Sequence, residues 1–251
     1  MTKFYTKFYI KHLTIFASLY LAAHAAHAVH PLVTDDTGTQ DTGNQQIELN
    51  TDWIQRRATR GEVANFTYSY GVSQNLDAII NVPRSNFAPA GLSDVTIGGK
   101  WRFFEQDDTS FALKSFLSMP TGDQNQGLGS GRVSASAALI SSHVSGPWAW
   151  HTNLGVAMNR YQLPSDDQAN RRWLWQASTA LVREISEQWK VVGDIGIARN
   201  PDVSSHTNPA YALTGLIYSP AKNLDFDVGF KYGLNTAEVH RQLGVGVTWR
   251  F

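Results

Sequence analysis

The stretch that decides the fold is the final one, residues 240–251, which read His-Arg-Gln-Leu-Gly-Val-Gly-Val-Thr-Trp-Arg-Phe. From Leu243 onward every second residue is apolar, ending with Trp249 and Phe251, and glycine, threonine and arginine occupy the positions between. A period of two places the apolar side chains on one face of a β-strand and the others on the opposite face. The termini of soluble domains are usually solvated and frayed, so an apolar, aromatic end favours the closing strand of an outer-membrane β-barrel. The last strand of a water-soluble sandwich is the alternative.

The N-terminal segment has the pattern of a secretory signal peptide. Lys3, Lys7 and Lys11 precede an apolar run over 13–23 that is too short to span a bilayer. Small residues at Ala26 and Ala28 then suit a signal peptidase. We therefore expect a signal peptide over 1–28 and a mature chain from residue 29. Cleavage after residue 25 satisfies the same rule, and an uncleaved membrane anchor is the alternative.

The composition of the chain excludes several classes of protein. After residue 28 there is no stretch of about 18 apolar residues, so no transmembrane helix is expected. The absence of cysteine excludes disulfides and thiolate metal sites, and 21 basic against 21 acidic residues argue against a nucleic-acid partner. No cofactor is expected. A charged fraction of 17% with 20 glycines and 8 tryptophans suits a wall of membrane-facing strands.

Alternating segments recur through the rest of the chain, at lengths near the roughly 9–11 residues that a tilted membrane-spanning strand needs. We count about twelve strands, an even number as bacterial barrels have. They cover residues 46–54, 63–72, 75–83, 92–104, 109–119, 131–142, 147–158, 172–183, 188–199, 209–219, 223–233 and 240–251. The predicted fold is all-β, a transmembrane antiparallel up-and-down β-barrel over 46–251.

Two further patterns separate a barrel from a soluble sandwich. The first is connection length, because short and long connections should alternate when short turns face the periplasm. Short ones are expected at 72–75, 105–108, 143–146, 184–187 and 220–222, and long ones at 55–62, 84–91, 120–130, 159–171, 200–208 and 234–239. The second is an aromatic girdle, because indole rings prefer the headgroup level. The tryptophans fall at strand ends: Trp53, Trp173 and Trp175 on the outer side, and Trp101, Trp148, Trp150, Trp189 and Trp249 on the periplasmic side.

The lumen-facing side chains are the candidates for function, since membrane-facing ones only anchor the wall. By alternation they include Glu48, Asp52, Asp77, Asp94, Lys100, Arg102, Lys114, Arg132, His151, Lys190, Asp194, Asp225, Asp227, Lys231 and Arg250. A lining of a single charge would indicate ion selectivity. This mixed lining favours an internal ion-pair network, with a polar track that reads a solute as the alternative.

Residues 29–45 form an N-terminal arm without apolar periodicity. It carries Asp35, Asp36 and Asp41, and could fold into the lumen against basic residues and plug it, as other barrels are plugged. A loose periplasmic tail is the alternative.

Signatures of an enzyme are weak. Ser141, Ser142 and His143 lie together at a predicted turn, with His151 in the next strand, but the nucleophile spacing Gly-x-Ser-x-Gly is absent. His206 and His240 have no partner at metal-ligand spacing. Asp123 and the pair Asp166-Asp167 could bind a cation, but isolated loop carboxylates are usually solvated, so no metal site is expected.

Several motifs resemble the MetA-pathway-of-phenol-degradation family of exported proteins. They are His30-Pro31-Leu32-Val33-Thr34-Asp35-Asp36, the run from Gly91 to Phe103, Met119-Pro120-Thr121-Gly122-Asp123, and Gly127-Leu128-Gly129-Ser130-Gly131. The resemblance implies an outer-membrane barrel that moves small, often aromatic, compounds. It implies no catalytic residue.

The sequence thus predicts a channel in the cell outer membrane for passive uptake of small solutes, aromatic or hydrophobic ones included. Its expected partners are membrane lipid, lipopolysaccharide, the solute, and the barrel-insertion machinery, which would recognise Trp249 and Phe251. An outer-membrane lipid-acting hydrolase and a closed structural barrel are the alternatives.

Overall fold

The computed structural model describes residues 30–56, 60–86 and 89–251. Nearly all regular structure in this part of the chain is β-strand. The strands are β1 (Gln45–Gln55), β2 (Arg60–Ser73), β3 (Leu76–Ser85), β4 (Gly91–Leu92), β5 (Thr96–Gln106), β6 (Thr109–Ser118), β7 (Ser134–Ser145), β8 (Trp148–Met158), β9 (Trp173–Glu184), β10 (Trp189–Ala198), β11 (Ala210–Ala221), β12 (Leu224–Gly233) and β13 (Arg241–Arg250).

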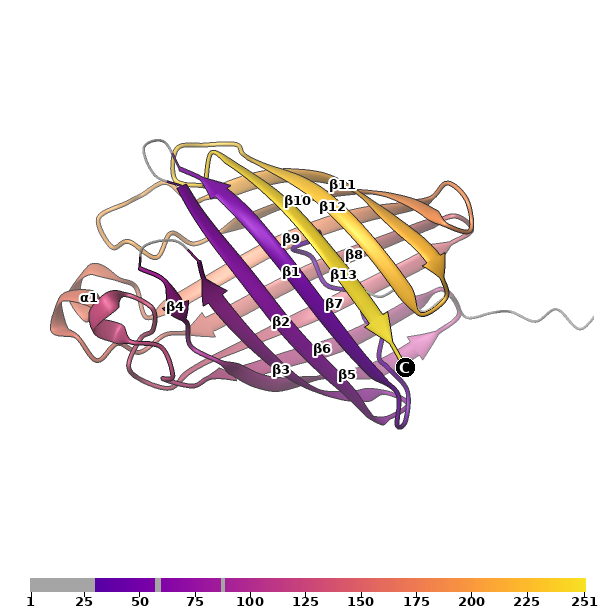
Figure 1. The fold of residues 1–251 in the computed structure, drawn as a ribbon, viewed down its shortest axis with the longest axis horizontal. Helices are drawn as coiled ribbons and strands as arrows, with labels where there is room; N and C mark the ends of the chain where they lie inside the picture. Colours follow the sequence, from indigo (N-terminus) through magenta and orange to yellow (C-terminus); the bar gives the residue numbers. More distant parts are fainter. Residues whose placement is uncertain (1–29, 57–59, 87–88) are drawn as a thin grey trace, which may run out of the picture.

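Twelve of these strands close into one antiparallel barrel (Figure 1). Neighbours in the chain are neighbours in the sheet, and β1 pairs with both β2 and β13, which seals the ring. The short β4 lies outside it and pairs with the end of β3 beyond β5. The prediction of a closed up-and-down barrel is confirmed, and β13, the segment with the most regular alternation, is its closing strand.

The two ends of the barrel differ. Tight connections gather at one end, here called the turn end: 74–75, 107–108, 146–147, 185–188 and 222–223. The opposite end, the loop end, carries the long connections. These contain the helix α1 (Pro164–Ala169) and the 3-10 turn Gln124–Gln126. The predicted alternation of short and long connections holds except at the first loop-end connection, which was expected over 55–62 but spans only 56–59, the same length as the turn at 185–188.

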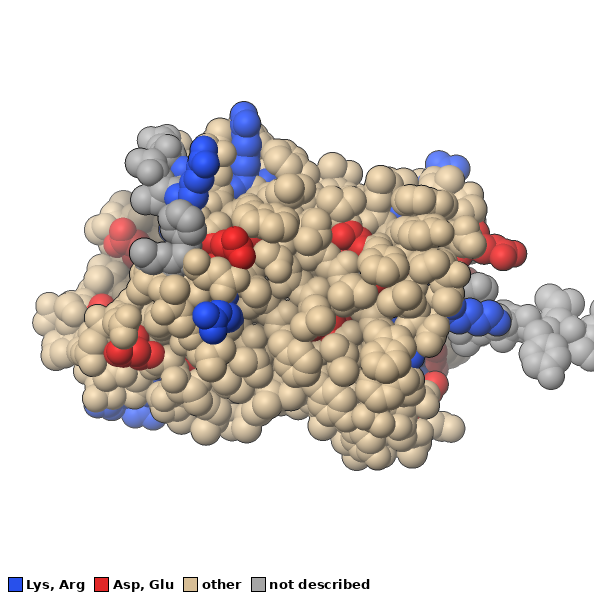
Figure 2. Space-filling view, in the orientation of Figure 1, with Lys and Arg blue, Asp and Glu red and all other residues tan. Residues whose placement is uncertain are grey.

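The wall is apolar outside and polar inside. On β12, Phe226, Val228 and Phe230 are exposed, whereas Asp225 and Asp227 are buried in the lumen. All eight tryptophans of the chain are exposed, and the face of the wall seen in Figure 2 is largely uncharged. No described helix is long and apolar enough to cross a membrane.

Two predicted strands were wrong in part. The segment 92–104 is interrupted, since β5 begins only at Thr96, and Asp94 therefore lies between strands. Its carboxylate accepts hydrogen bonds from the backbone N–H groups of Gly122 (3.0 Å) and Ser130 (2.8 Å), so it holds the loop at 119–133. Arg132 belongs to that loop and is exposed, because β7 begins at Ser134.

Candidate functional site: the lumen and its N-terminal arm

The arm, residues 30–44, lies inside the barrel (Figure 1). It runs from mid-height, at His30, to the turn end, where Gly43 and Asn44 exchange backbone hydrogen bonds with Gly71 of β2. Thr34 and Asp36 are fully buried. The plugging arrangement considered from sequence is therefore the one adopted by the described residues. The predicted signal peptide, 1–28, lies outside them.

Asp194 of β10 is the main anchor of the arm. One carboxylate oxygen accepts the backbone N–H groups of Val33 and Thr34, each at 2.8 Å. The other accepts the Thr34 hydroxyl (2.8 Å) and the Tyr211 hydroxyl (3.0 Å). Since Asp194 is only 2% exposed, these bonds satisfy a charge that would otherwise be costly to bury.

Two lysines of the wall hold the arm's carboxylates. Lys100 lies 3.3 Å from Asp35 and 3.5 Å from Asp36, and Lys114 pairs with the other oxygen of Asp35. Burial alone would raise the pKa of Asp35, but the two ammonium groups hold it well below its usual value. On the opposite side, Asn153 turns its amide to the backbone of Asp35, with contacts of 2.6 and 2.9 Å.

His30 joins two carboxylates at the start of the arm. Its Nδ1 lies 2.5 Å from Asp227 and its Nε2 lies 3.2 Å from Asp52. Burial alone would lower the pKa of His30, but its hydrogen bonds to these two partners raise it to about 9. The imidazolium is thus the favoured form, and it crosslinks β1 to β12.

Pro31 packs against two strand residues that have no side chains, Gly215 and Gly229. A Cβ atom on Gly229 of β12 would lie 2.2 Å from the Cβ of Pro31, and one on its partner Gly215 would lie 2.6 Å from the Pro31 Cγ. The glycine pair lets the arm reach the strand backbone.

The arm ends in polar contacts at the turn end. Thr37 donates its backbone N–H to Ser142 (3.1 Å), and Gln40 donates its backbone N–H to the carboxylate of Asp77 (3.0 and 3.2 Å). Asp41 departs from the prediction: it is an exposed turn residue with φ of 63°, and it does not face a lysine of the lumen.

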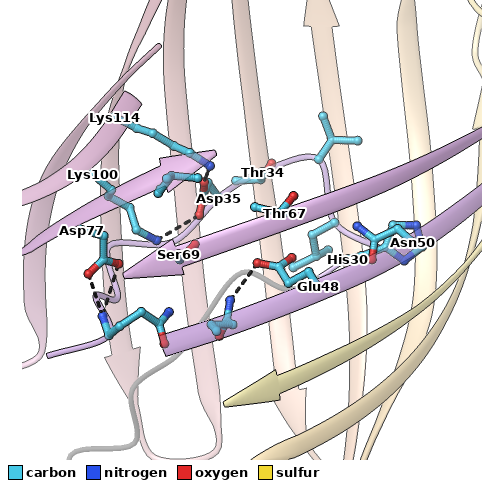
Figure 3. A pocket seen from close by; sticks show the side chains of 15 residues that line it. His30, Thr34, Asp35, Glu48, Asn50, Thr67, Ser69, Asp77, Lys100 and Lys114 are labelled. Atoms are coloured by element: carbon cyan, nitrogen blue, oxygen red, sulfur yellow. Dashed lines mark hydrogen bonds and ion pairs between the residues drawn. The ribbon is translucent and has the colours of Figure 1, made fainter. Parts of the chain in front are cut away.

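Two cavities flank the arm. The turn-side cavity, about 210 Å³, is polar and lies against β1–β3; its wall residues include Gln46, Glu48, Asn50, Thr67 and Ser69 (Figure 3). The loop-side cavity, about 330 Å³, lies against β6–β10 and is more apolar; its wall residues include Phe116, Ile140, Leu174 and Gln176. Both cavities are lined by Val33, Asp35 and Lys114, which therefore stand between them.

The other predicted lumen residues form ion pairs away from these cavities. Arg250 binds Asp225 at 2.7 Å, Lys190 lies 3.4 Å from Glu184, Lys231 lies 3.4 Å from Glu238, and Arg102 lies 3.2 Å from Glu105. These are separate ion pairs and not the predicted network; two of them link neighbouring strands, β9 to β10 and β12 to β13.

The residues of the hydrolase alternative are only partly together. The hydroxyl of Ser142 lies 2.8 Å from Nδ1 of His151, whereas His143 pairs with Thr109. Ser142 and His151 are 2% and 1% exposed, and Thr37 of the arm covers Ser142. A bulky acyl substrate has no access to this pair while the arm is docked.

Sequence reasoning missed the roles of His30, Thr34 and Asn153. His30 and Thr34 lie in a segment without periodicity, and Asn153 looks like any polar lumen position of β8. Their partners are strands far away in the chain, which single-sequence patterns do not reveal.

Comparisons with known proteins agree with this geometry. A family model described as "Putative MetA-pathway of phenol degradation" matches residues 33–251. Among solved structures, an outer-membrane channel from Pseudomonas putida F1 superposes with a TM-score of 0.68 at 10% identity, over 86% of this chain and 98% of the channel. The NanC porin superposes at 0.63 with 9% identity over 81% and 98% of the two chains, and the KdgM porin at 0.60 with 9% identity over 82% and 99%. A search of curated proteins gave no match. The shared feature is the barrel fold.

Proposed function

Because the chain belongs to the family described as "Putative MetA-pathway of phenol degradation", we propose that it is an outer-membrane channel for the passive passage of small solutes. An exposed apolar wall around a charged interior is stable in lipid and unfavourable in water. Seven exposed tryptophans lie near strand ends and would serve as the aromatic girdle, with lipid and lipopolysaccharide around them. Trp101, which was expected at a strand end, lies in the middle of β5. The turn end faces the periplasm.

The observation that carries the proposal is the pair of cavities that share Val33, Asp35 and Lys114. We take the two cavities as successive parts of a route past the docked arm, with the Asp35–Lys114 pair, which lines both, at its constriction. A cavity of about 150 Å³ can hold benzene, so either space accommodates a single-ring solute. The side chains of Phe116, Ile140 and Leu174 suit an apolar or aromatic body in the loop-side cavity.

The test is conductance of the purified protein in planar bilayers, together with uptake of labelled small solutes by liposomes. We expect small, discrete conductance steps. Lys114→Ala should enlarge them, because it shortens a side chain at the constriction. Lys190→Ala is the matched control, since Lys190 pairs with Glu184 and lines neither cavity. Absence of both conductance and solute passage, in the wild type and in Lys114→Ala, would refute the proposal.

A closed structural barrel is the second candidate. The observation in its favour is the tight binding of the arm by strands on several sides of the lumen, including β3, β5, β6, β10 and β12. A closed barrel predicts neither conductance nor solute passage, in the wild type or in Lys114→Ala, so the same measurement separates the two candidates.

A further inference from the structure

Glu48 differs from the other lumen carboxylates in its partners. Within the described chain, Asp35 and Asp36 face lysines, Asp52 and Asp227 face His30, Asp225 faces Arg250, and Asp77 and Asp194 accept N–H groups of the arm backbone. Glu48 accepts one hydrogen bond, from the side-chain amide of Gln46 at 2.7 Å, and lies within 4 Å of none of the described basic groups. When Glu48 is ionised, no ion-pair contact among the described residues balances its charge.

The surroundings of Glu48 supply more oxygen atoms. Asn50 occupies the next lumen position of β1 and lines the same turn-side cavity; its side-chain oxygen is buried and has no hydrogen-bond partner. Thr248 lies opposite Glu48 on β13, and its buried hydroxyl oxygen also has no hydrogen-bond partner, but Thr248 does not line the cavity. Glu48 and Asn50 are therefore the neighbouring β1 residues that place oxygen atoms on this side of the cavity.

The basic residues of the cavity are already engaged. Figure 3 shows Lys100 directed to Asp35, with Lys114 beside the same carboxylate, across the cavity from Glu48. His30 also lines the cavity, but its two ring nitrogens face Asp52 and Asp227. Glu48 and Asp77 are the lining carboxylates outside these pairs, and Asp77 is bound by the backbone N–H of Gln40, so Glu48 is the one left to face an entering ion.

We propose that the turn-side cavity binds small cations, either a monovalent metal ion or a solute with an ammonium group, and that Glu48 is its specificity-determining residue. The proposal rests on the channel function and adds a charge class to it. A single charge within about 4 Å of an ion changes the local ion population by about fivefold, even at the dielectric of water.

The first measurement is the reversal potential of single channels in a KCl gradient. The wild type should favour K⁺ over Cl⁻, and Glu48→Gln should lower the permeability ratio about fivefold. Glu187→Gln, in the exposed turn at 185–188, changes the same charge away from the cavity and should leave the ratio unchanged. A wild type without cation preference, or a ratio that Glu48→Gln does not lower, would overturn the inference while leaving the channel function in place.

The second measurement does not need conductance. Crystals soaked in RbCl should show an anomalous peak at the Glu48 carboxylate, and crystals of Glu48→Gln should not. A peak in a protein that conducts nothing would support the cation site and refute the channel. A wild-type crystal without a peak there would overturn the site even if the protein conducts.

Discussion

Replacing the carboxylate of Asp194 should loosen the arm without disturbing the barrel. Asp194→Asn keeps the shape of the side chain and removes its charge. A hydrogen bond to a charged acceptor contributes about 1.5–3 kcal/mol and one to a neutral acceptor about 0.5–1.5 kcal/mol. The two backbone N–H groups bound by Asp194 should each lose about 1 kcal/mol, whereas the Thr34 and Tyr211 hydroxyls can turn and accept from the amide. The docked arm should therefore be less stable by about 2 kcal/mol.

That loss corresponds to about a 30-fold larger population of the undocked arm. The chain contains no cysteine, so Thr37→Cys supplies a unique thiol at a position that is 4% exposed when the arm is docked. Maleimide labelling in detergent should then be about 30-fold faster in Asp194→Asn, provided that the docked form still predominates.

Asp225→Asn is the matched control, because Asp225 is a lumen carboxylate bound by Arg250 and Ser219. It should leave the labelling rate within about twofold of the wild type, because its printed partners, Ser219 and Arg250, belong to the wall and not to the arm. Equal rates in Asp194→Asn and the wild type would refute the assignment of Asp194 as the anchor. An equal acceleration in Asp225→Asn would show that the barrel, and not the arm, had loosened.

Three further predictions use the same reasoning. Gly229→Ala should accelerate labelling of the arm, because its Cβ would lie 2.2 Å from Pro31. Gly193→Ala should not accelerate labelling, because a Cβ there meets nothing nearer than 3.9 Å. Equal labelling rates in the two variants would contradict the close packing of Pro31 on Gly229. Since its carboxylate partners raise the pKa of His30 to about 9, its stabilisation of the docked arm is complete below pH of about 6.5 and lost as pH rises through 9. The labelling rate of His30→Gln divided by that of the wild type should therefore fall toward one between pH of about 6.5 and 9. A ratio that does not change with pH would refute the stabilising role of charged His30. Deletion of Phe251, whose backbone pairs with residue 45, should impair assembly in the outer membrane before it alters conductance, and normal insertion of the shortened chain would contradict this.

The barrel itself could be predicted because its signals are local. Alternation along β12 or β13 needs only neighbouring residues, and a tight turn such as 107–108 is visible as a short gap between two alternating runs. The interruption at Asp94 could not be predicted, since the carboxylate is satisfied by N–H groups of Gly122 and Ser130, which lie in a distant loop. The alternation of apolar and polar residues continues through Asp94, so the sequence gives no sign that the strand is interrupted there.

The site was less predictable for the same reason. The acidic pair Asp35 and Asp36 pointed toward basic lumen residues, but nothing in the arm specified which ones. The pairing of the two alternating segments could have indicated them, because Lys100 and Lys114 are directly opposite each other on β5 and β6. Like charges in that position repel, so a wall that places them there requires a counter-charge from elsewhere.

That requirement also decides how the channel can work. If the arm left the lumen, Lys100 and Lys114 would face each other without Asp35, and Asp194 would lose the N–H groups that satisfy its charge. Exposing several charges that are paired in the docked state costs several times the thermal energy, even with water filling the space. On the proposed function, we therefore expect the arm to stay docked during conduction and solutes to pass beside it through the two cavities. That path would limit transport to molecules of about the size of a single ring, and it makes Asp35 and Lys114, which line both cavities, the first residues to test.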